Sequence, residues 1–202
     1  NVWAHASADQ VDRYLRPALR GELKDAYAVT EQDAGSDPSA IAATAKPTAS
    51  GFLLNAEKWF VTAGDVASVY VVMANVTDGA DRLPTLFVVD RDRRGVEIVD
   101  DPAFTHSYPD RHPTIRFTDV EVGPDDYIGE IGGGDDLQRS WFSEERLGIA
   151  ARGVGSMWRL LEETVDWATS REQGGERIYD YQGVSFPLAD SAADAAAGRL
   201  LA

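Results

Sequence analysis

The densest group of polar and small residues that could do chemistry lies between Tyr27 and Asp37, in the run Tyr-Ala-Val-Thr-Glu-Gln-Asp-Ala-Gly-Ser-Asp. A β-type segment leads directly into a loop here, so successive backbone N–H groups and the hydroxyls of Thr30 and Ser36 could face a ligand. Gly35 would let the backbone approach that ligand closely. The same composition is also typical of an ordinary turn at the end of a strand.

A second group has two adjacent aromatic residues followed by a threonine, at the end of the run from Gly51 to Thr62. Because side chains alternate along a strand, we expect Trp59 and Phe60 to face opposite sides. One ring would then pack in the core while the other offers a flat face to a ring system. Aromatic residues that only fill a core are the ordinary alternative. Neither group alone identifies a function.

The other reactive residue types give little indication of a function. His106, Asp110 and His112 share one loop and could be imagined as metal ligands, but their spacing matches no known metal-binding pattern. The sequence has no cysteine, which excludes a disulfide framework, a thiolate metal site and a cysteine nucleophile.

The charge balance also restricts the function. There are 19 Lys and Arg against 34 Asp and Glu, a net charge of −15, which opposes nonspecific binding to nucleic acid or to an anionic membrane. An anionic ligand must therefore be held by local donors. Aspartate and arginine far outnumber the three lysines, a bias typical of salt-adapted proteins and equally of GC-rich genomes. No run is apolar for long enough to span a membrane, and residues 1–20 lack a signal peptide, so we predict a soluble cytoplasmic protein.

The elements that must position these residues begin with a helix over 8–20. Ser7 and Gln10 form a capping-box pattern before it, and Gly21 stands where a C′ glycine would end it. Pro17 is expected to shorten or kink this helix.

Short β-type runs separated by Gly, Pro, Asp and Asn follow, with no helix between them. The seven predicted strands are 26–30, 40–46, 52–62, 68–76, 84–90, 95–100 and 113–122. Such a succession favours a mostly antiparallel barrel or sandwich. After the glycine loop at 132–134, apolar residues recur at helical spacing over 136–170, and an Ala-rich helical stretch occupies 182–202 beyond a turn at 171–181. Because proline is tolerated in a first turn, the regular part of this second helix is predicted to start at Pro187.

The fold class is therefore predicted to be α+β: a mostly antiparallel β barrel or sandwich, flanked by an N-terminal helix and by long C-terminal helices of a helical-bundle domain. The predicted divisions are 1–24 for the end of an N-terminal helical domain, 25–131 for a central β domain, and 132–202 for the truncated start of a C-terminal helical domain.

The order and separation of the two chemical groups resemble the paired signatures of the acyl-CoA dehydrogenase family. Thr30-Glu31 and Ala34-Gly35-Ser36-Asp37 match its "TE-x-x-AGSD" signature. The second run resembles "G-x-K-x-aromatic-[IV]-[ST]", with Ala56 where glycine is usual. Residues 115–122 are similar to the family's "F-x-D-V-x-V-P" strand, although Gly123 delays the proline by one position, and Ser143-Glu-Glu-Arg146 resembles the start of the long helix after the β domain. Arg171 and Gln182 are placed like its "R-x-x-F-G…Q" contact, with Gly174 replacing phenylalanine. The resemblance covers essentially the whole chain.

The resemblance implies FAD as cofactor and a role for each matching residue. Tyr27, Val29 and Thr30 would bind the edge of the isoalloxazine ring, Phe60 would cover one face of it, and Thr62 would bond near its N5. Ser36, Ser143 and Arg146 would contact the acyl-CoA substrate. Arg171 and Gln182 would reach the FAD pyrophosphate of a neighbouring subunit in a homodimer or homotetramer, and an electron-transfer flavoprotein could accept the electrons. Loss of the phenylalanine at 174 would weaken the hydrophobic part of that contact between subunits.

The family reaction takes a proton from Cα with a carboxylate base and moves a hydride from Cβ to flavin N5. Most members carry the base in the C-terminal helical domain, which here would lie beyond Ala202. A minority use a glutamate directly before the arginine of the helix after the β domain, which is Glu145 in this chain. An acidic residue favoured by the helix dipole is the alternative explanation of Glu145.

Two other functions remain open at this point. One is an acyl-CoA oxidase or a nitroalkane-oxidase-like enzyme, which would pass electrons to oxygen. The other is a noncatalytic β-domain binding module. We also expect the 202 residues alone to lack turnover, because most of both helical domains would lie outside them.

Overall fold

The computed structural model describes residues 2–79, 81–106 and 108–202. The chain forms two compact units, one ending at Ser140 and the other covering Trp141–Ala202. We call them the β unit and the helical unit. No helix among the described residues is both long and apolar enough to cross a membrane.

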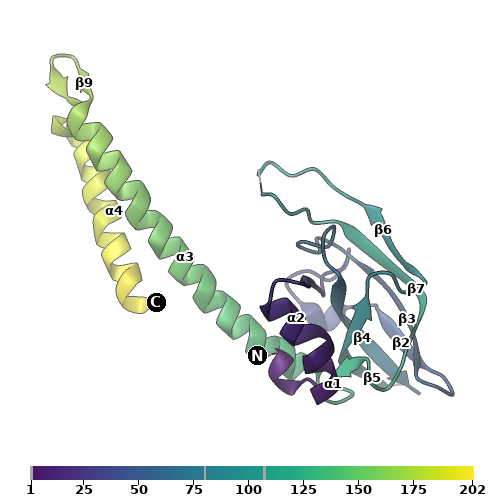
Figure 1. Ribbon diagram of the computed structural model, residues 1–202. Coiled ribbons are helices and arrows are strands. Elements are labelled where there is room, and N and C mark those ends of the chain that lie inside the picture. The colour runs from purple at the N-terminus through teal and green to yellow at the C-terminus, as the bar shows by residue number, and fades with distance from the viewer. Residues whose placement is uncertain (1, 80, 107) are drawn as a thin grey trace. The chain divides into compact units, whose positions relative to one another are not determined.

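An eight-stranded mixed sheet forms the β unit (Figure 1). Its strands are β1 (Asp25–Ala28), β2 (Thr44–Pro47), β3 (Phe52–Lys58), β4 (Val69–Asp78), β5 (Asp81–Asp90), β6 (Val96–Asp100), β7 (Thr114–Val122) and β8 (Tyr127–Ile128). The order is β6-β7-β3-β2-β4-β5-β8, with β1 also paired to β4. The pairs β1–β4 and β2–β4 are parallel and the other pairs are antiparallel. The predicted mostly antiparallel sheet and α+β class are confirmed, and β8 is an addition.

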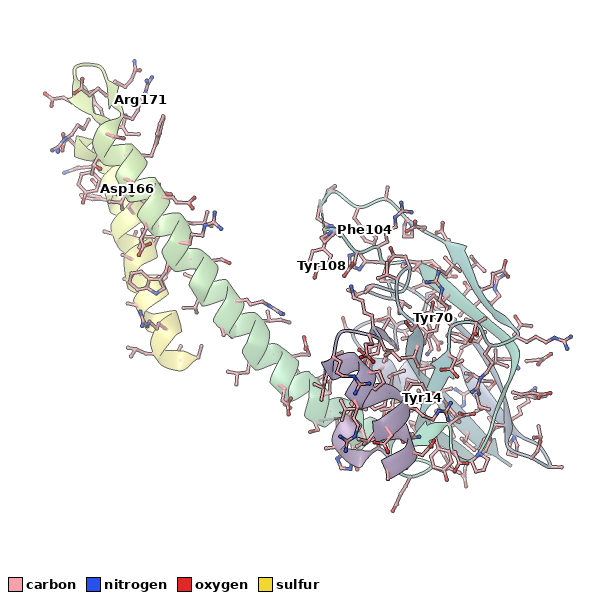
Figure 2. All side chains as sticks on the ribbon, in the orientation of Figure 1. Tyr14, Tyr70, Phe104, Tyr108, Asp166 and Arg171 are labelled. Atoms are coloured by element: carbon pink, nitrogen blue, oxygen red, sulfur yellow. The ribbon has the colours of Figure 1, made fainter. Side chains whose placement is uncertain are left out.

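The core of this unit comes from both faces of the central strands. Val69–Ala74 on β4 and Leu86–Val89 on β5 are continuously buried, as the uninterrupted apolar runs predicted. Tyr70, labelled in Figure 2, is fully buried, and its hydroxyl donates to the Gly64 carbonyl at 2.9 Å. Tyr70 also meets Phe117 of β7 edge to face. These packed strands form the rigid support for the loops at their ends.

Before the sheet, the chain forms the short 3₁₀ turn η1 (Val2–His5) and a helical run made of α1 (Ala8–Gln10), the π-helical turn η2 (Val11–Leu15) and α2 (Arg16–Leu19). The Ser7 capping box is confirmed, with both of its hydrogen bonds present. The π-helical turn directly precedes α2, in whose first turn Pro17 lies, and because the helical run is continuous here the missing N–H of Pro17 removes one helical hydrogen bond. Gln10 joins this run to the sheet by donating to the carbonyls of Asp125 and Tyr127.

The structure corrects the end of the third predicted strand. β3 ends at Lys58 rather than at 62, because Phe60 and Ala63 have left-handed backbones with φ of 55° and 61°. The expected alternation of Trp59 and Phe60 therefore does not apply, since both lie beyond the strand. The second predicted strand is also shorter, because Pro38–Ala40 form the 3₁₀ turn η3.

The helical unit contains most of α3 (Gly134–Ser170) and all of α4 (Gln182–Leu201). Between them lie the strands β9 (Glu172–Gln173) and β10 (Glu176–Arg177), which form a small hairpin, and the 3₁₀ turn η4 (Ile178–Asp180). Figure 1 shows α4 running back alongside α3. The predicted start of regular helix at Pro187 is wrong: the helix begins at Gln182 and includes the proline.

Candidate functional site

A buried ion pair joins the two segments that carry the chemical groups. The Lys58 side chain is fully buried, and its Nζ donates to Glu31 Oε1 at 2.7 Å and to the Val29 carbonyl at 3.0 Å. The Glu31 carboxylate also accepts the backbone N–H groups of Ala42 and Ala43 at 2.6 and 3.1 Å. Burial lowers the pKa of Lys58 to about 8, and the nearby Glu31 carboxylate opposes this effect. We call this arrangement the Lys58–Glu31 clamp. It fixes the end of β3 against the segment after β1.

The backbone after the clamp crosses from one strand end to another. The Trp59 N–H donates to the Thr30 carbonyl at 2.8 Å, and the Val61 N–H donates to the Pro113 carbonyl at 3.0 Å. Phe60 lies between these two anchors with its left-handed φ, and its side chain is 49% exposed. A left-handed, non-glycine residue held by its neighbours costs about 1–3 kcal/mol and is typical of ligand sites. In this strained conformation, Phe60 turns a face of its ring toward the outside of the protein.

The loop between β6 and β7 brings further rings to the same place. Phe104 meets Phe60 edge to face, with ring centroids 5.9 Å apart, and stacks on His106 at 5.2 Å. Tyr108 stacks on His112 at 6.1 Å. Figure 2 shows Phe104 and Tyr108 on this loop. Phe60 is thus one member of an aromatic and imidazole cluster that comes mainly from a distant part of the sequence.

Thr62 lies at the edge of this cluster, beside a cavity. Its Oγ1 is 3.1 Å from His112 Nδ1. The cavity has a volume of about 510 Å³ and is lined by Thr62, His106, Tyr108, Pro109 and His112. This volume lies within the range of small-molecule sites, roughly 300–1,000 Å³. Thr30 and Ser36 are not among its lining residues.

Several contacts hold the loop against the segment around Thr62. Lys24 and Asp110 form an ion pair at 2.6 Å. The Ala63 N–H donates to the Arg111 carbonyl at 2.9 Å, and the Arg111 N–H donates to Asp65 Oδ1 at 3.2 Å. The Ala63 bond and the Val61 bond to Pro113 lie on either side of Thr62 in the sequence, so they hold Thr62 next to the loop that carries His112.

The first chemical group lies on β1 and the loop after it. Burial raises the pKa of the Tyr27 hydroxyl, and Val29 is buried with its carbonyl bound by the clamp. Thr30 is half-buried, whereas Ser36 is exposed. Reciprocal backbone hydrogen bonds between Glu31 and Ala34 close the turn that leads to Ser36.

The remaining predicted site residues belong to the helical unit. Ser143, Glu145 and Arg146 are exposed within one turn of α3. Arg171 directly follows α3, and Gln182 is the first residue of α4. Both are exposed. Figure 2 shows Arg171 at the end of α3, next to the β9–β10 hairpin.

The glycine that replaces phenylalanine at 174 has a structural reason. Gly174 and Gly175 form the turn between β9 and β10 with φ of 70° and 89°, values that glycine accepts without steric cost. A Cβ at 174 would lie 2.9 Å from the Tyr181 hydroxyl, which donates to the Gln173 carbonyl. A phenylalanine would therefore not fit this turn.

The sequence did not reveal the clamp, and it indicated His106 and His112 only as candidate metal ligands rather than as a hydrogen-bonded pair. The signal for the clamp was that Lys58 lies four residues after Leu54 and so on the same face of the strand, since a charge at an inward position needs a buried partner. The signal for the pair was that two of the three histidines share one short loop. Among the described residues, no group of three or more His, Cys, Asp or Glu side chains is placed to hold a metal ion, and the two imidazoles bond to each other instead, with their Nε2 atoms 3.1 Å apart.

Comparison with known proteins agrees with this geometry. Residues 26–120 match the description "Acyl-CoA dehydrogenase, middle domain", and residues 132–202 match "Acyl-CoA dehydrogenase, C-terminal domain". The chain is 30% identical to the caffeyl-CoA reductase-Etf complex subunit CarC of Acetobacterium woodii, over 96% of this chain and 51% of the relative. It is 31% identical to the 3-(aryl)acrylate reductase of Clostridium sporogenes, over 96% and 52%.

A solved structure described as PigA with FAD and proline superposes with a TM-score of 0.93 at 28% identity, over 98% of this chain and 52% of that one. The chain spans about half the length of the relatives that it matches. Two adjoining domains of one family therefore follow each other here in sequence. The chain belongs to the acyl-CoA dehydrogenase family of FAD-dependent oxidoreductases.

Proposed function

We propose that the full protein oxidises the Cα–Cβ bond of an acyl-CoA thioester, with FAD as the hydride acceptor. The observation that carries this proposal is the exposed Phe60 ring, packed on Phe104 of the aromatic and imidazole cluster, together with Thr62, which lines a cavity of about 510 Å³. We also propose that residues 25–131 act as the domain that binds flavin and acyl-CoA. Residues 1–24 and 132–202 would belong to the two helical domains beside it.

The residues of the β unit fit a flat heteroaromatic ring. Phe60 offers an aromatic face held by a strained backbone, and Thr62 offers a hydroxyl that lies 3.1 Å from His112 Nδ1. Stacking favours a planar ligand, and the hydroxyl can donate to a ring nitrogen. Tyr27, Val29 and Thr30 would line the edge of the ring.

Two exposed side chains of the helical unit suit the phosphate part of FAD. The Arg171 guanidinium can bind phosphate oxygens with two parallel N–H groups, and Gln182 adds an amide donor. The Arg171 guanidinium donates to the Gln173 side chain at 3.4 Å. We propose that Arg171 and Gln182 bind the pyrophosphate of a neighbouring copy, so that a homodimer or homotetramer is the working form.

When bound, FAD supplies the acceptor for the hydride from Cβ. Glu145 is our candidate for the base that takes the Cα proton, and a carboxylate in the C-terminal helical domain outside these residues is the alternative. Ser36, Ser143 and Arg146 would hold the substrate and its CoA arm. Hydrogen bonds to the thioester carbonyl are needed to make Cα acidic enough for a carboxylate.

The names of two relatives suggest a substrate class and a partner. One is described as a caffeyl-CoA reductase-Etf complex subunit and the other as a 3-(aryl)acrylate reductase. We therefore include aryl-substituted acyl groups among the candidates and propose an electron-transfer flavoprotein as electron acceptor.

Anaerobic mixing of the full-length, FAD-loaded protein with a panel of acyl-CoA thioesters tests the proposal. Straight-chain, branched and aryl-substituted saturated thioesters should be compared by the rate at which they bleach the flavin absorbance near 450 nm. The free acids serve as matched controls, since they lack the CoA arm. Bleaching by at least one thioester and by none of the acids is the expected result.

Two results would contradict the proposal. A full-length protein that binds no flavin would indicate a noncatalytic module. Rapid oxygen consumption during turnover, without any need for an electron-transfer flavoprotein, would indicate an oxidase.

A further inference from the structure

Four groups near Thr62 form an unbroken series of hydrogen bonds. The Tyr108 backbone N–H donates to His106 Nδ1 at 3.0 Å. His106 Nε2 lies 3.1 Å from His112 Nε2. His112 Nδ1 lies 3.1 Å from Thr62 Oγ1. Each imidazole therefore uses both of its ring nitrogens.

The first of these bonds fixes the direction of the others. A peptide N–H can only donate, so His106 Nδ1 must be the acceptor and carries no hydrogen. In neutral His106 the hydrogen is then on Nε2, which donates to His112 Nε2. His112 must in turn carry its hydrogen on Nδ1, and this N–H donates to Thr62 Oγ1.

The series ends on a hydroxyl whose orientation is thereby set. Thr62 Oγ1 accepts from His112 along one lone pair, so its own hydrogen must point elsewhere. The hydroxyl borders the cavity of about 510 Å³, and Phe60 lies two residues before it. The hydroxyl can therefore donate a hydrogen bond to an acceptor in the cavity.

We propose that the Tyr108 N–H, His106 and His112 form a directional relay that holds the Thr62 hydroxyl as a hydrogen-bond donor to a ring nitrogen of the bound flavin. This inference rests on the proposed function for the identity of the ligand, although the direction of the relay does not depend on it. His106 and His112 are positioning residues, because they act through Thr62.

The rings around the imidazoles support this role. Phe104 stacks on His106 with an interplanar angle of 19°, and Tyr108 stacks on His112 with an angle of 20°. The two imidazole planes cross at 79°. The stacked ring on one face and the edge-on contacts around it restrict rotation of each imidazole, so the nitrogens stay aimed at their partners. A cluster that only filled space would not require the two opposite tautomers.

The first test is nitrogen-15 NMR of the imidazoles in the full-length protein without FAD, with signals assigned from the variants H106F and H112F. The expected result is that His106 carries its hydrogen on Nε2 and His112 carries it on Nδ1. Identical tautomers at the two positions would overturn the relay, whether or not the protein binds flavin.

The second test measures the FAD dissociation constant and the flavin absorption spectrum. H112F keeps a ring for packing but has no donor for Thr62, so FAD binding should weaken about three- to tenfold, the effect of one neutral hydrogen bond. H112N places an amide N–H near the lost Nδ1 position and should recover most of that loss together with the wild-type spectrum. Equal dissociation constants for wild type and H112F would overturn the proposal. A wild-type protein that binds no FAD would instead refute the proposed function, and the tautomer result would then decide the direction of the relay.

Discussion

Replacing Lys58 with methionine tests the Lys58–Glu31 clamp, because methionine has a similar length and no charge. The substitution removes two hydrogen bonds from a fully buried ammonium, to Glu31 Oε1 at 2.7 Å and to the Val29 carbonyl at 3.0 Å. It leaves a nearly buried carboxylate, 10% exposed, without its counter-charge. Removing one partner of a buried ion pair costs about 3–5 kcal/mol.

The structure favours the lower end of that range. Glu31 keeps the backbone N–H groups of Ala42 and Ala43 at 2.6 and 3.1 Å, so its carboxylate is not left bare. Lys58 itself also resists burial, as its lowered pKa shows. We therefore expect K58M to reduce the free energy of unfolding by about 3 kcal/mol at pH 7. The double variant K58M/E31Q, which removes both charges, should recover about 2 kcal/mol of this loss.

The effect should depend on pH in a defined direction. The pKa of Lys58 is lowered to about 8 from 10.5, so the unfolded chain binds more protons than the folded chain between these two values. Stability from this residue therefore rises with pH through that window, by about 1 kcal/mol between pH 7 and pH 9. In K58M this contribution is absent, and the gap between wild type and variant should widen by the same amount.

Urea unfolding at fixed FAD concentration, followed by tryptophan fluorescence, measures these differences. K46M is the matched control, since Lys46 is exposed on β2, and it should change stability by less than about 0.5 kcal/mol. A loss below about 1 kcal/mol for K58M, or a gap to wild type that narrows from pH 7 to pH 9, would refute the reasoning about the clamp.

Three further predictions concern other parts of the chain. E145Q should slow flavin reduction by acyl-CoA about 10²–10⁴-fold while FAD and ligand still bind, and E144Q is its control, because consecutive helical residues point about 100° apart. Reduction of E145Q at the wild-type rate would place the base elsewhere. G95A should destabilise the protein by about 2 kcal/mol or more, because Gly95 has φ of 93° and a Cβ there would lie 2.2 Å from a β7 carbonyl oxygen. G21A, with φ of 72° and nothing near its Cβ, should lose only about 1 kcal/mol when both variants are compared by urea unfolding. R171K should raise the FAD dissociation constant about tenfold, because lysine cannot form two parallel bonds to phosphate, and an unchanged value by flavin fluorescence titration would argue against this contact.

Sequence patterns predicted the elements whose formation depends on nearby residues. The capping box at Ser7 and the apolar runs of β4 and β5 are local signals, and the structure confirms all three. β8 was not predicted, because its two residues pair with β5 through a long-range contact that leaves no periodic pattern in the sequence. The start of α4 was predicted too late because a proline is commonest in the first turn of a helix, whereas Pro187 lies inside α4.

The candidate site also contains features that the sequence predicted and features that it did not. The loop after β1 and the aromatic pair before Thr62 stood out by residue type alone. Their physical connection through Lys58 did not, because it requires knowing which strand ends meet. The left-handed φ of Phe60 could not be predicted from the sequence either, because it arises from the hydrogen bonds of Trp59 and Val61 to two separate parts of the chain. Likewise, the histidine series depends on how the β6–β7 loop is anchored near Thr62.

The clamp also affects how the family evolves. Glu31 and Lys58 lie within the two signatures that suggest catalysis, and they bond to each other and to the backbone of Val29, Ala42 and Ala43. A duplicated gene whose product had lost turnover would still need both residues to fold. Selection for folding would then preserve these signature positions long after the reacting residues had been substituted. Divergence should show first at the residues proposed to face the ligand, such as Thr62 and Glu145, and last at the clamp.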